Sequence, residues 1–178
     1  KKFFAWLKKN SKEILQLKND ELLISAITKS CKVKRHFVLK DTHESNLRMQ
    51  LNFGHTFAHS LEALHGFSKK LNHGEAVLIG MLLATKLSMI KKVCNIKEAN
   101  KIFDHYKNQK INFNLKNFVP KNKMNKIISL MINDKKNNDN KINFILLKKI
   151  GKTTNSGDHK LSASELKKYF PKLIDLNF

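Results

Sequence analysis

The chain is poor in cysteine, arginine and long apolar runs, and each shortage argues against a class of protein. Its two cysteines, Cys31 and Cys94, lie far apart without a Cys-x-x-Cys spacing, so we expect reduced thiols and a cytoplasmic location. No apolar run approaches the ~18 residues of a membrane span, and the longest, residues 76–83, is interrupted by Gly80. The apolar part of the N-terminus is too short for a signal peptide. We therefore expect no contact with a membrane.

Acidic residues are also scarce, and the net charge of +21 raises the possibility of a nucleic-acid-binding protein. Only Arg35 and Arg48 are arginines, however, although arginine is the residue best suited to reading base edges and binding phosphates in a bidentate manner. The lysines are scattered along the chain among many asparagines. We interpret them mainly as a solvated surface whose positive field attracts small anionic substrates, and we expect no nucleic-acid partner.

The hydrophobic periodicity predicts a mainly α-helical domain that comprises all 178 residues. We expect a multi-helix bundle with a small β-hairpin, in which residues 141–148 pair with residues 150–154. The Gly-rich strand–helix motif of a dinucleotide-binding fold is absent. Ser11 is expected to cap the second helix and Pro171 to end the last one. The predicted helices span residues 2–9, 12–18, 20–40, 48–65, 74–93, 97–106, 123–133 and 163–171.

The strongest chemical signal comes from histidines in and just after the predicted helix 48–65. His55 and His59 stand four residues apart and share one helix face, and His73 opens the next helix after a short polar loop. Two antiparallel helices can then direct two imidazoles at one point, as in a divalent metal site. On these grounds either His55 or His59 could pair with His73. Three glutamates are candidates for holding the other ring nitrogens: Glu44, Glu62 and Glu75.

Arg48 and Asn52 extend this polar row toward the N-terminus, at helical spacing from His55. If the row faces inward, its groups need partners, because burying them unpaired costs several kcal/mol. A cleft that holds a metal and an anionic ligand would provide such partners. The alternative is a row that faces water. Gly54 lies inside the same predicted helix, at a cost of about 1 kcal/mol relative to alanine, which indicates that something packs closely against its backbone.

These residues belong to a longer pattern. The segment from Glu44 to Glu62, ESNLRMQLNFGHTFAHSLE, followed by HGEAVLIGM at residues 73–81, resembles the signature of 3-dehydroquinate synthases. Two departures are mild, since Asn46 and Ala58 stand where that family usually has glycine. Weaker similarity covers four positions upstream and three short segments downstream: Ser30, Lys34, Val38, Asp41, residues 134–136, residues 142–147 and residues 150–151.

The resemblance implies that residues 1–178 form the C-terminal helical domain of such an enzyme, which binds metal and substrate, with the N-terminal NAD-binding α/β domain absent from this chain. It implies a lyase of the shikimate pathway that converts 3-deoxy-arabino-heptulosonate 7-phosphate into 3-dehydroquinate and phosphate. The implied cofactors are NAD and a divalent metal, zinc or cobalt. The full-length enzyme is expected to be a homodimer.

The resemblance also implies roles for individual residues. By their positions in the motif, the metal ligands are His55 and His73. His59 would transfer protons, and Glu44 would orient it. The substrate-binding residues would be Lys34, Arg48, Asn52, Lys135 and Lys136.

The third metal ligand implied by the family is a glutamate in a segment that precedes this domain. We therefore expect the chain alone to bind metal weakly, to have no useful affinity for NAD and to catalyse no turnover. Two alternatives share much of the pattern: related sugar-phosphate cyclases, and polyol dehydrogenases of the iron-containing type, which use helical-domain histidines. The Arg-x-x-x-Asn spacing at residues 48–52 and the His-Gly-Glu motif at residues 73–75 favour a cyclase.

Overall fold

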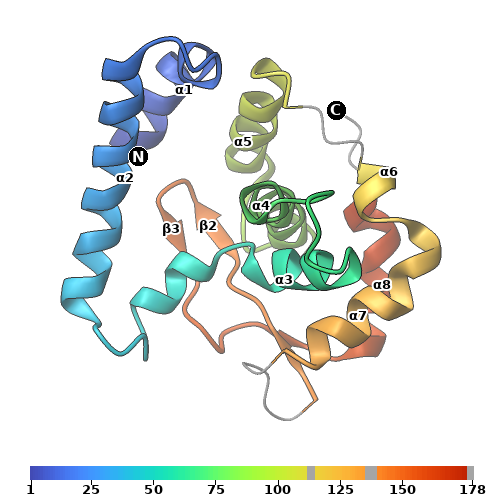
Figure 1. Cartoon of the computed structure of the whole chain (residues 1–178). Coiled ribbons are helices and arrows are strands. Elements are labelled where there is room, and N and C mark those ends of the chain that lie inside the picture. Colours follow the sequence, from blue (N-terminus) through green and yellow to red (C-terminus); the bar gives the residue numbers. More distant parts are fainter. Residues whose placement is uncertain (112–114, 135–139, 176–178) are drawn as a thin grey trace.

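The apolar helix α4 (His73–Ile90) lies at the centre of the molecule, and other helices pack around it (Figure 1). The structure, a computed structural model, describes residues 1–111, 115–134 and 140–175. Glu75 begins α4 by accepting a hydrogen bond at 2.9 Å from the backbone N–H of Asn72. Length and composition would also allow α4 to span a membrane, but half of it is buried inside the protein. The prediction of a buried core helix here is confirmed.

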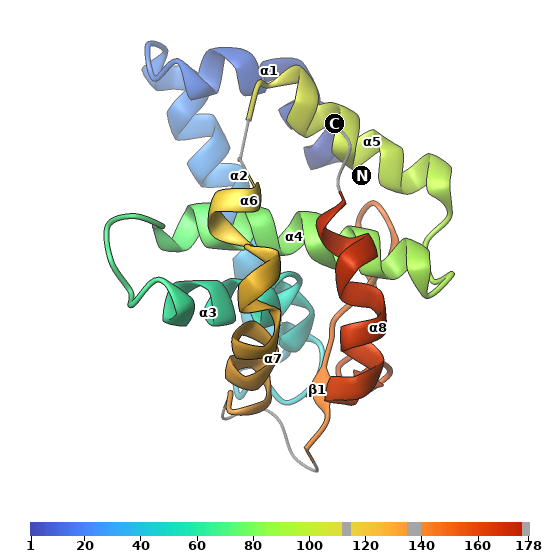
Figure 2. The same cartoon turned by 90° about the vertical axis from the view of Figure 1, so that its right-hand side faces the viewer.

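Helix α3 (His55–Leu64) lies along α4, and two glycines set the distance between them (Figure 2). A Cβ on Gly54 would lie 2.6 Å from the backbone nitrogen of Met81. A Cβ on Gly80 would lie 3.0 Å from the carbonyl carbon of Gly54 and closer still to its oxygen. Both contacts are with backbone atoms, which cannot rotate away. The close packing predicted at Gly54 is confirmed.

The prediction of one continuous helix from residue 48 to residue 65 was wrong. Residues Arg48–Asn52 form a short 3₁₀ helix, η1, and α3 begins only after Gly54. Gly54 has a φ of +86°, in the left-handed region that glycine adopts without strain. The chain therefore turns at Gly54, because the close contact with α4 outweighs the helical periodicity of the sequence.

Helices α7 (Met124–Ile132) and α8 (Ala163–Ile174) complete the main core by packing on α3 and α4 (Figure 2). The short helices α6 (Leu115–Phe118) and η2 (Lys121–Lys123) precede α7. The last helix continues through Pro171, so the prediction that it ends there was wrong. Phe170 and Leu173 are buried on either side of the proline, and this burial holds the helix together across it.

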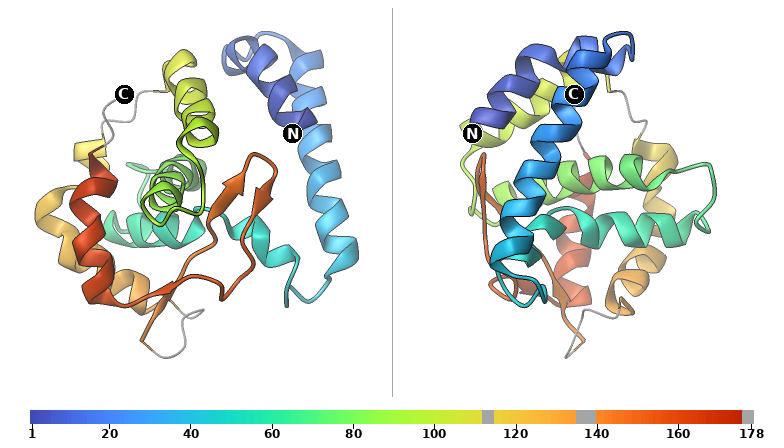
Figure 3. Two further views of the ribbon diagram at one scale, coloured as in Figure 1. Left: turned by 180° about the vertical axis from the view of Figure 1, so that it is seen from behind. Right: turned by 60° about the vertical axis from the view of Figure 1, so that its left-hand side comes forward.

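Helices α1 (Lys2–Leu15) and α2 (Asp20–Lys40) contact each other and stand beside the core (Figure 3). The predicted break at Ser11 was wrong, because its hydroxyl donates a hydrogen bond at 2.6 Å to the carbonyl of Leu7 within the same helix. Phe4 of α1 packs edge-on against His105 of α5 (Ile96–Asn108), with ring centres 5.4 Å apart. Helix α2 buries none of its residues.

Within the described part of the chain, four short strands complete the fold. Strand β2 (Leu147–Lys149) pairs antiparallel with β3 (Lys152–Thr153), which confirms the predicted hairpin. Strand β1 (Ile142–Asn143) instead pairs with β4 (Lys160–Leu161), a strand that was not predicted. The backbone N–H of Leu147 donates at 2.8 Å to the hydroxyl of Ser88, which ties the hairpin to α4. The mainly α-helical bundle with a small β element is therefore as predicted.

Candidate metal centre

Three histidine rings come together where α3 and α4 begin. His55 is the first residue of α3, His59 lies one turn later, and His73 is the first residue of α4. The ring centre of His55 is 5.6 Å from that of His59 and 5.8 Å from that of His73. Two imidazoles bound to one zinc ion at about 2.0–2.1 Å have ring centres roughly 5 to 6 Å apart. Both pairs, His55 with His73 and His55 with His59, therefore have the ring spacing of two ligands of one metal.

Two carboxylates contact the Nδ1 atoms of these rings. Glu62 Oε1 lies 3.0 Å from His73 Nδ1, and Asp134 Oδ2 lies 3.1 Å from His59 Nδ1. A carboxylate at Nδ1 keeps the proton on that nitrogen and leaves the lone pair on Nε2. For His73 this is the tautomer that a metal ligand requires, and for His59 it is the tautomer that a proton acceptor requires.

The three glutamates predicted as candidate partners of the histidine rings have different contacts in the structure. Glu62 contacts a histidine ring, that of His73, as predicted, whereas Glu75 caps α4. Glu44 contacts Arg48 and Asn52. Asp134, which contacts His59 from a position 75 residues later in the chain, was not predicted for this role. Its only signal in the sequence was its place before the two lysines of the weakly similar segment 134–136.

A small cavity of about 70 Å³ lies beside His55 and His59. Asn52, Thr56 and Asp134 also line it, so several polar side chains border the cavity. A wider cavity of about 410 Å³ adjoins it, because Met49, Asn143 and Ser156 line both. Lys141 and Lys160 are the charged residues of the wider cavity's wall. The two cavities together offer space for a small molecule next to the histidines, and the two lysines favour one that carries negative charge.

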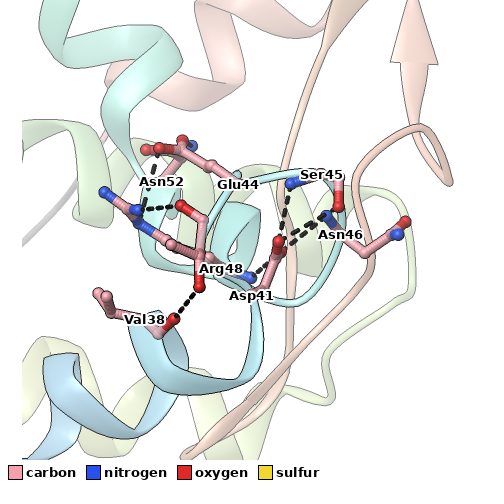
Figure 4. A network of polar contacts seen from close by, with 8 residues as sticks. Val38, Asp41, Glu44, Ser45, Asn46, Arg48 and Asn52 are labelled. Atoms are coloured by element: carbon pink, nitrogen blue, oxygen red, sulfur yellow. Dashed lines mark hydrogen bonds and ion pairs between the residues drawn. The ribbon is translucent and has the colours of Figure 1, made fainter.

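Arg48 and Asn52 are joined through Glu44 (Figure 4). The Asn52 amide donates to Glu44 Oε1 at 2.8 Å, and Arg48 Nε lies 3.8 Å from Glu44 Oε2. A second group of the guanidinium, Nη1, donates at 2.9 Å to the carbonyl of Thr42. Both residues are half-buried, and the protein itself provides partners for them. The polar row thus faces inward in part, although its first two residues lie on the 3₁₀ helix and its histidines on α3, rather than all on one α-helical face.

Of the three predicted lysines, only Lys34 lies among the described residues, and it lines neither cavity. Lys34 is exposed on α2, and among the described residues its ammonium group has no ion pair. Lys135 and Lys136 lie outside the described residues. The role of all three in binding substrate therefore stays a prediction.

The donor set is suited to zinc or cobalt. Neutral imidazole nitrogens bind both metals well, and the Glu62–His73 pair has the arrangement usual for metal-bound histidine. Over residues 1–111, 115–134 and 140–175, no group of three His, Cys, Asp or Glu side chains could hold a metal ion by itself. His55 and His73 have the spacing that two of the ligands of such a metal would have.

Fold and site together define a helical domain in which a pair of histidines, spaced as two ligands of one metal would be, lies beside a small cavity. Comparison with known families makes the assignment specific. Residues 1–137 match the family described as 3-dehydroquinate synthase C-terminal, and the chain belongs to this family.

Curated relatives agree with this assignment. The chain is 45% identical over 151 residues to the 3-dehydroquinate synthase of Pelagibacter ubique (strain HTCC1062), a match that covers 85% of this chain and 41% of the relative. It is 38% identical over 156 residues to the same enzyme of Prochlorococcus marinus (strain MIT 9215), covering 85% and 40% respectively. The chain thus spans less than half the length of these relatives.

A solved structure shares the fold. The 2-epi-5-epi-valiolone synthase of Streptomyces hygroscopicus subsp. jinggangensis 5008, with NAD+ and Zn2+ bound, superimposes with a TM-score of 0.75 and 19% sequence identity. The match covers 97% of this chain and 46% of that one. At this level of identity the similarity establishes the shared fold alone.

Proposed function

We propose that this chain is the metal- and substrate-binding part of a 3-dehydroquinate synthase. In this proposal the whole enzyme converts 3-deoxy-arabino-heptulosonate 7-phosphate into 3-dehydroquinate and phosphate, in the shikimate pathway and in the cytoplasm. The observation that carries the proposal is the approach of the His55 and His73 rings to 5.8 Å, with Glu62 in contact with His73 and a small cavity beside His55. The names of the curated relatives support the choice of reaction.

His55 and His73 are assigned as ligands of zinc or cobalt, and the third ligand is assigned to a glutamate of the preceding part of the enzyme. When bound, the metal polarises the substrate hydroxyl that is oxidised and lowers its pKa. Glu62 holds the His73 ring so that Nε2 faces outward from the carboxylate. No residue of this chain is assigned to NAD, because its sequence lacks a dinucleotide-binding motif.

His59 is assigned as the residue that transfers protons. Its ring lines the small cavity, and Asp134 occupies its Nδ1 side. Nε2 can then accept a proton from a substrate hydroxyl and return it later, while the Asp134 carboxylate stabilises the charged ring. The family motif gives the orienting role to Glu44. In this proposal Asp134 orients His59, and Glu44 acts on Arg48 and Asn52 instead.

Arg48, Asn52 and Lys34 are assigned to substrate binding. A guanidinium binds carboxylate or phosphate through charge-assisted hydrogen bonds, and Arg48 is the arginine beside the cavity residue Asn52. The amide of Asn52 donates to Glu44, which leaves its oxygen to accept from a substrate hydroxyl. Lys135 and Lys136 would add positive charge next to Asp134.

A chimera tests the activity directly. The part of the Pelagibacter ubique synthase that precedes its matching region is fused to this chain, and phosphate release from the heptulosonate phosphate is measured with NAD and zinc. We expect release that is lost in His55→Ala and His59→Ala and kept in His36→Ala, since His36 is exposed on α2. A chimera that folds and binds zinc but oxidises simple polyols without releasing phosphate would contradict the proposal and favour a polyol dehydrogenase.

A further inference from the structure

The carboxylate of Asp41, at the end of α2, accepts four hydrogen bonds from the loop that leads to η1 (Figure 4). Oδ1 accepts from the backbone N–H of Ser45 at 3.0 Å and from its hydroxyl at 3.2 Å. Oδ2 accepts from the backbone N–H groups of Asn46 at 2.8 Å and Arg48 at 2.9 Å. Both oxygens are therefore occupied by the protein, which leaves Asp41 with no direct part in binding a ligand.

These bonds also stabilise the charged form of Asp41. They lower the pKa of its carboxyl group to about 2, with the largest contribution from the N–H of Arg48, followed by those of Asn46 and Ser45. The group is ionised at every pH at which an enzyme of this kind would work. The loop is thus organised around a permanent negative charge.

The same loop has an unusual backbone at Glu44. Its φ of +54° lies in the left-handed region, where a residue with a Cβ is strained and persists only when its surroundings fix it. Asp41 binds the residues that follow Glu44 on its C-terminal side, and the Asp41 carbonyl accepts from the Glu44 N–H at 3.4 Å. From this position the Glu44 carboxylate reaches both Asn52 and Arg48.

We propose that Asp41 is a positioning residue, which fixes residues 42–48 so that Glu44 and Arg48 stand beside Asn52 at the edge of the histidine-lined cavity. Nothing in its own side chain touches a substrate. It acts by holding the guanidinium and the carboxylate in one arrangement before the ligand arrives, which lowers the entropy lost on binding. The predicted effect on catalysis rests on the proposed function, whereas the effect on loop geometry does not.

Asp41→Asn is the informative change. Asparagine keeps the shape of aspartate but replaces one acceptor oxygen by an NH₂ donor, so two of the four loop hydrogen bonds lose their acceptor. Asp158→Asn is the matched control. Asp158 also holds a loop, through Oδ2 and the backbone N–H of Asn155 at 2.9 Å, but it does not contact Glu44 or Arg48.

The first measurement uses this chain alone and NMR. In Asp41→Asn we expect the side-chain N–H signals of Arg48 and Asn52 to shift, and the amide of Asn46 to exchange with solvent about tenfold faster or more. Asp158→Asn should change none of these. If the Arg48 and Asn52 signals and the exchange rate of the Asn46 amide are unchanged in Asp41→Asn, the proposal is overturned. This measurement does not depend on the activity of the chimera, so it tests the positioning role even if the proposed function is wrong.

The second measurement uses the chimera. Asp41→Asn should raise KM by about tenfold or more while kcat changes by less than about threefold, because the reacting groups and the metal ligands stay in place. Zinc affinity should be unchanged, since His55 and His73 lie on α3 and α4. A parallel loss of zinc affinity and kcat would show that Asp41 acts only through general stability, and would overturn the positioning role.

Discussion

Gly80→Ala tests whether backbone contact between α3 and α4 sets the geometry of the histidines. The added Cβ would lie 3.0 Å from the carbonyl carbon of Gly54 and 3.1 Å from the backbone nitrogen of Ala58, with the Gly54 oxygen closer still. No side chain can move aside to relieve this contact. The two helices must therefore separate, and His73 at the start of α4 moves away from His55 at the start of α3.

The expected magnitude follows from two opposing effects. Overpacking a well-packed core costs about 1–3 kcal/mol, and contact with backbone atoms places Gly80→Ala near the upper end. Replacing glycine by alanine inside a helix returns about 1 kcal/mol. The net loss is about 2 kcal/mol in the free energy of unfolding, which corresponds to a melting temperature roughly 4 to 8 °C lower for a chain of this size.

Gly74→Ala is the control for the helix effect alone. Gly74 also belongs to α4, but a Cβ there would meet nothing within 4 Å. Its stability should be unchanged or raised by up to about 1 kcal/mol. Circular dichroism during thermal and urea unfolding measures both variants. If Gly80→Ala unfolds with the same free energy as Gly74→Ala, the reasoning about the glycine contact is refuted.

Two further predictions concern the histidines. Glu62→Ala should weaken cobalt binding by about 10–100-fold, because His73 loses the carboxylate that holds its ring; equal affinity in competition titrations would count against that role. The pKa of His105 in the folded protein is lowered by burial and, to a smaller extent, by the charge of Lys8. As the pH falls, this histidine is therefore protonated in the unfolded chain before it is protonated in the folded protein. The free energy of unfolding should therefore fall as the pH drops from about 7 to 5, and it should fall less in His105→Gln than in His36→Gln. Urea unfolding at several pH values measures this, and an equal dependence on pH in the two variants would contradict the prediction.

The sequence predicted the parts of this fold that depend on local pattern. The apolar run after His73 formed the expected helix, because burial and local preference agree there. Of the predicted strand 141–148, the end at Leu147 pairs in the expected hairpin, whereas Ile142 and Asn143 pair with β4 instead. The break at Gly54 was not predicted. Helical periodicity continues through it, and only the approach of α4, which comes from the tertiary structure, shows why the chain turns there.

The site was predictable to a similar extent. Position in the motif identified His55, His59 and His73, and the structure places their rings together. The contact between His59 and Asp134 was not predictable from spacing, since 75 residues separate the two. Asp41 gave no chemical signal either, because its partners are backbone N–H groups, which every residue except proline carries.

Zinc titration of the chain, followed by NMR of the imidazole nitrogens, tests the metal site most directly. We expect ring nitrogens of His55 and His73 to shift together, with weak affinity and one ion per chain, while exposed His36 does not respond. In His55→Ala the His73 response should largely disappear, because one imidazole alone holds zinc poorly. If instead His73 titrates unchanged without His55, the two rings do not share a metal, and the proposed metal site is wrong.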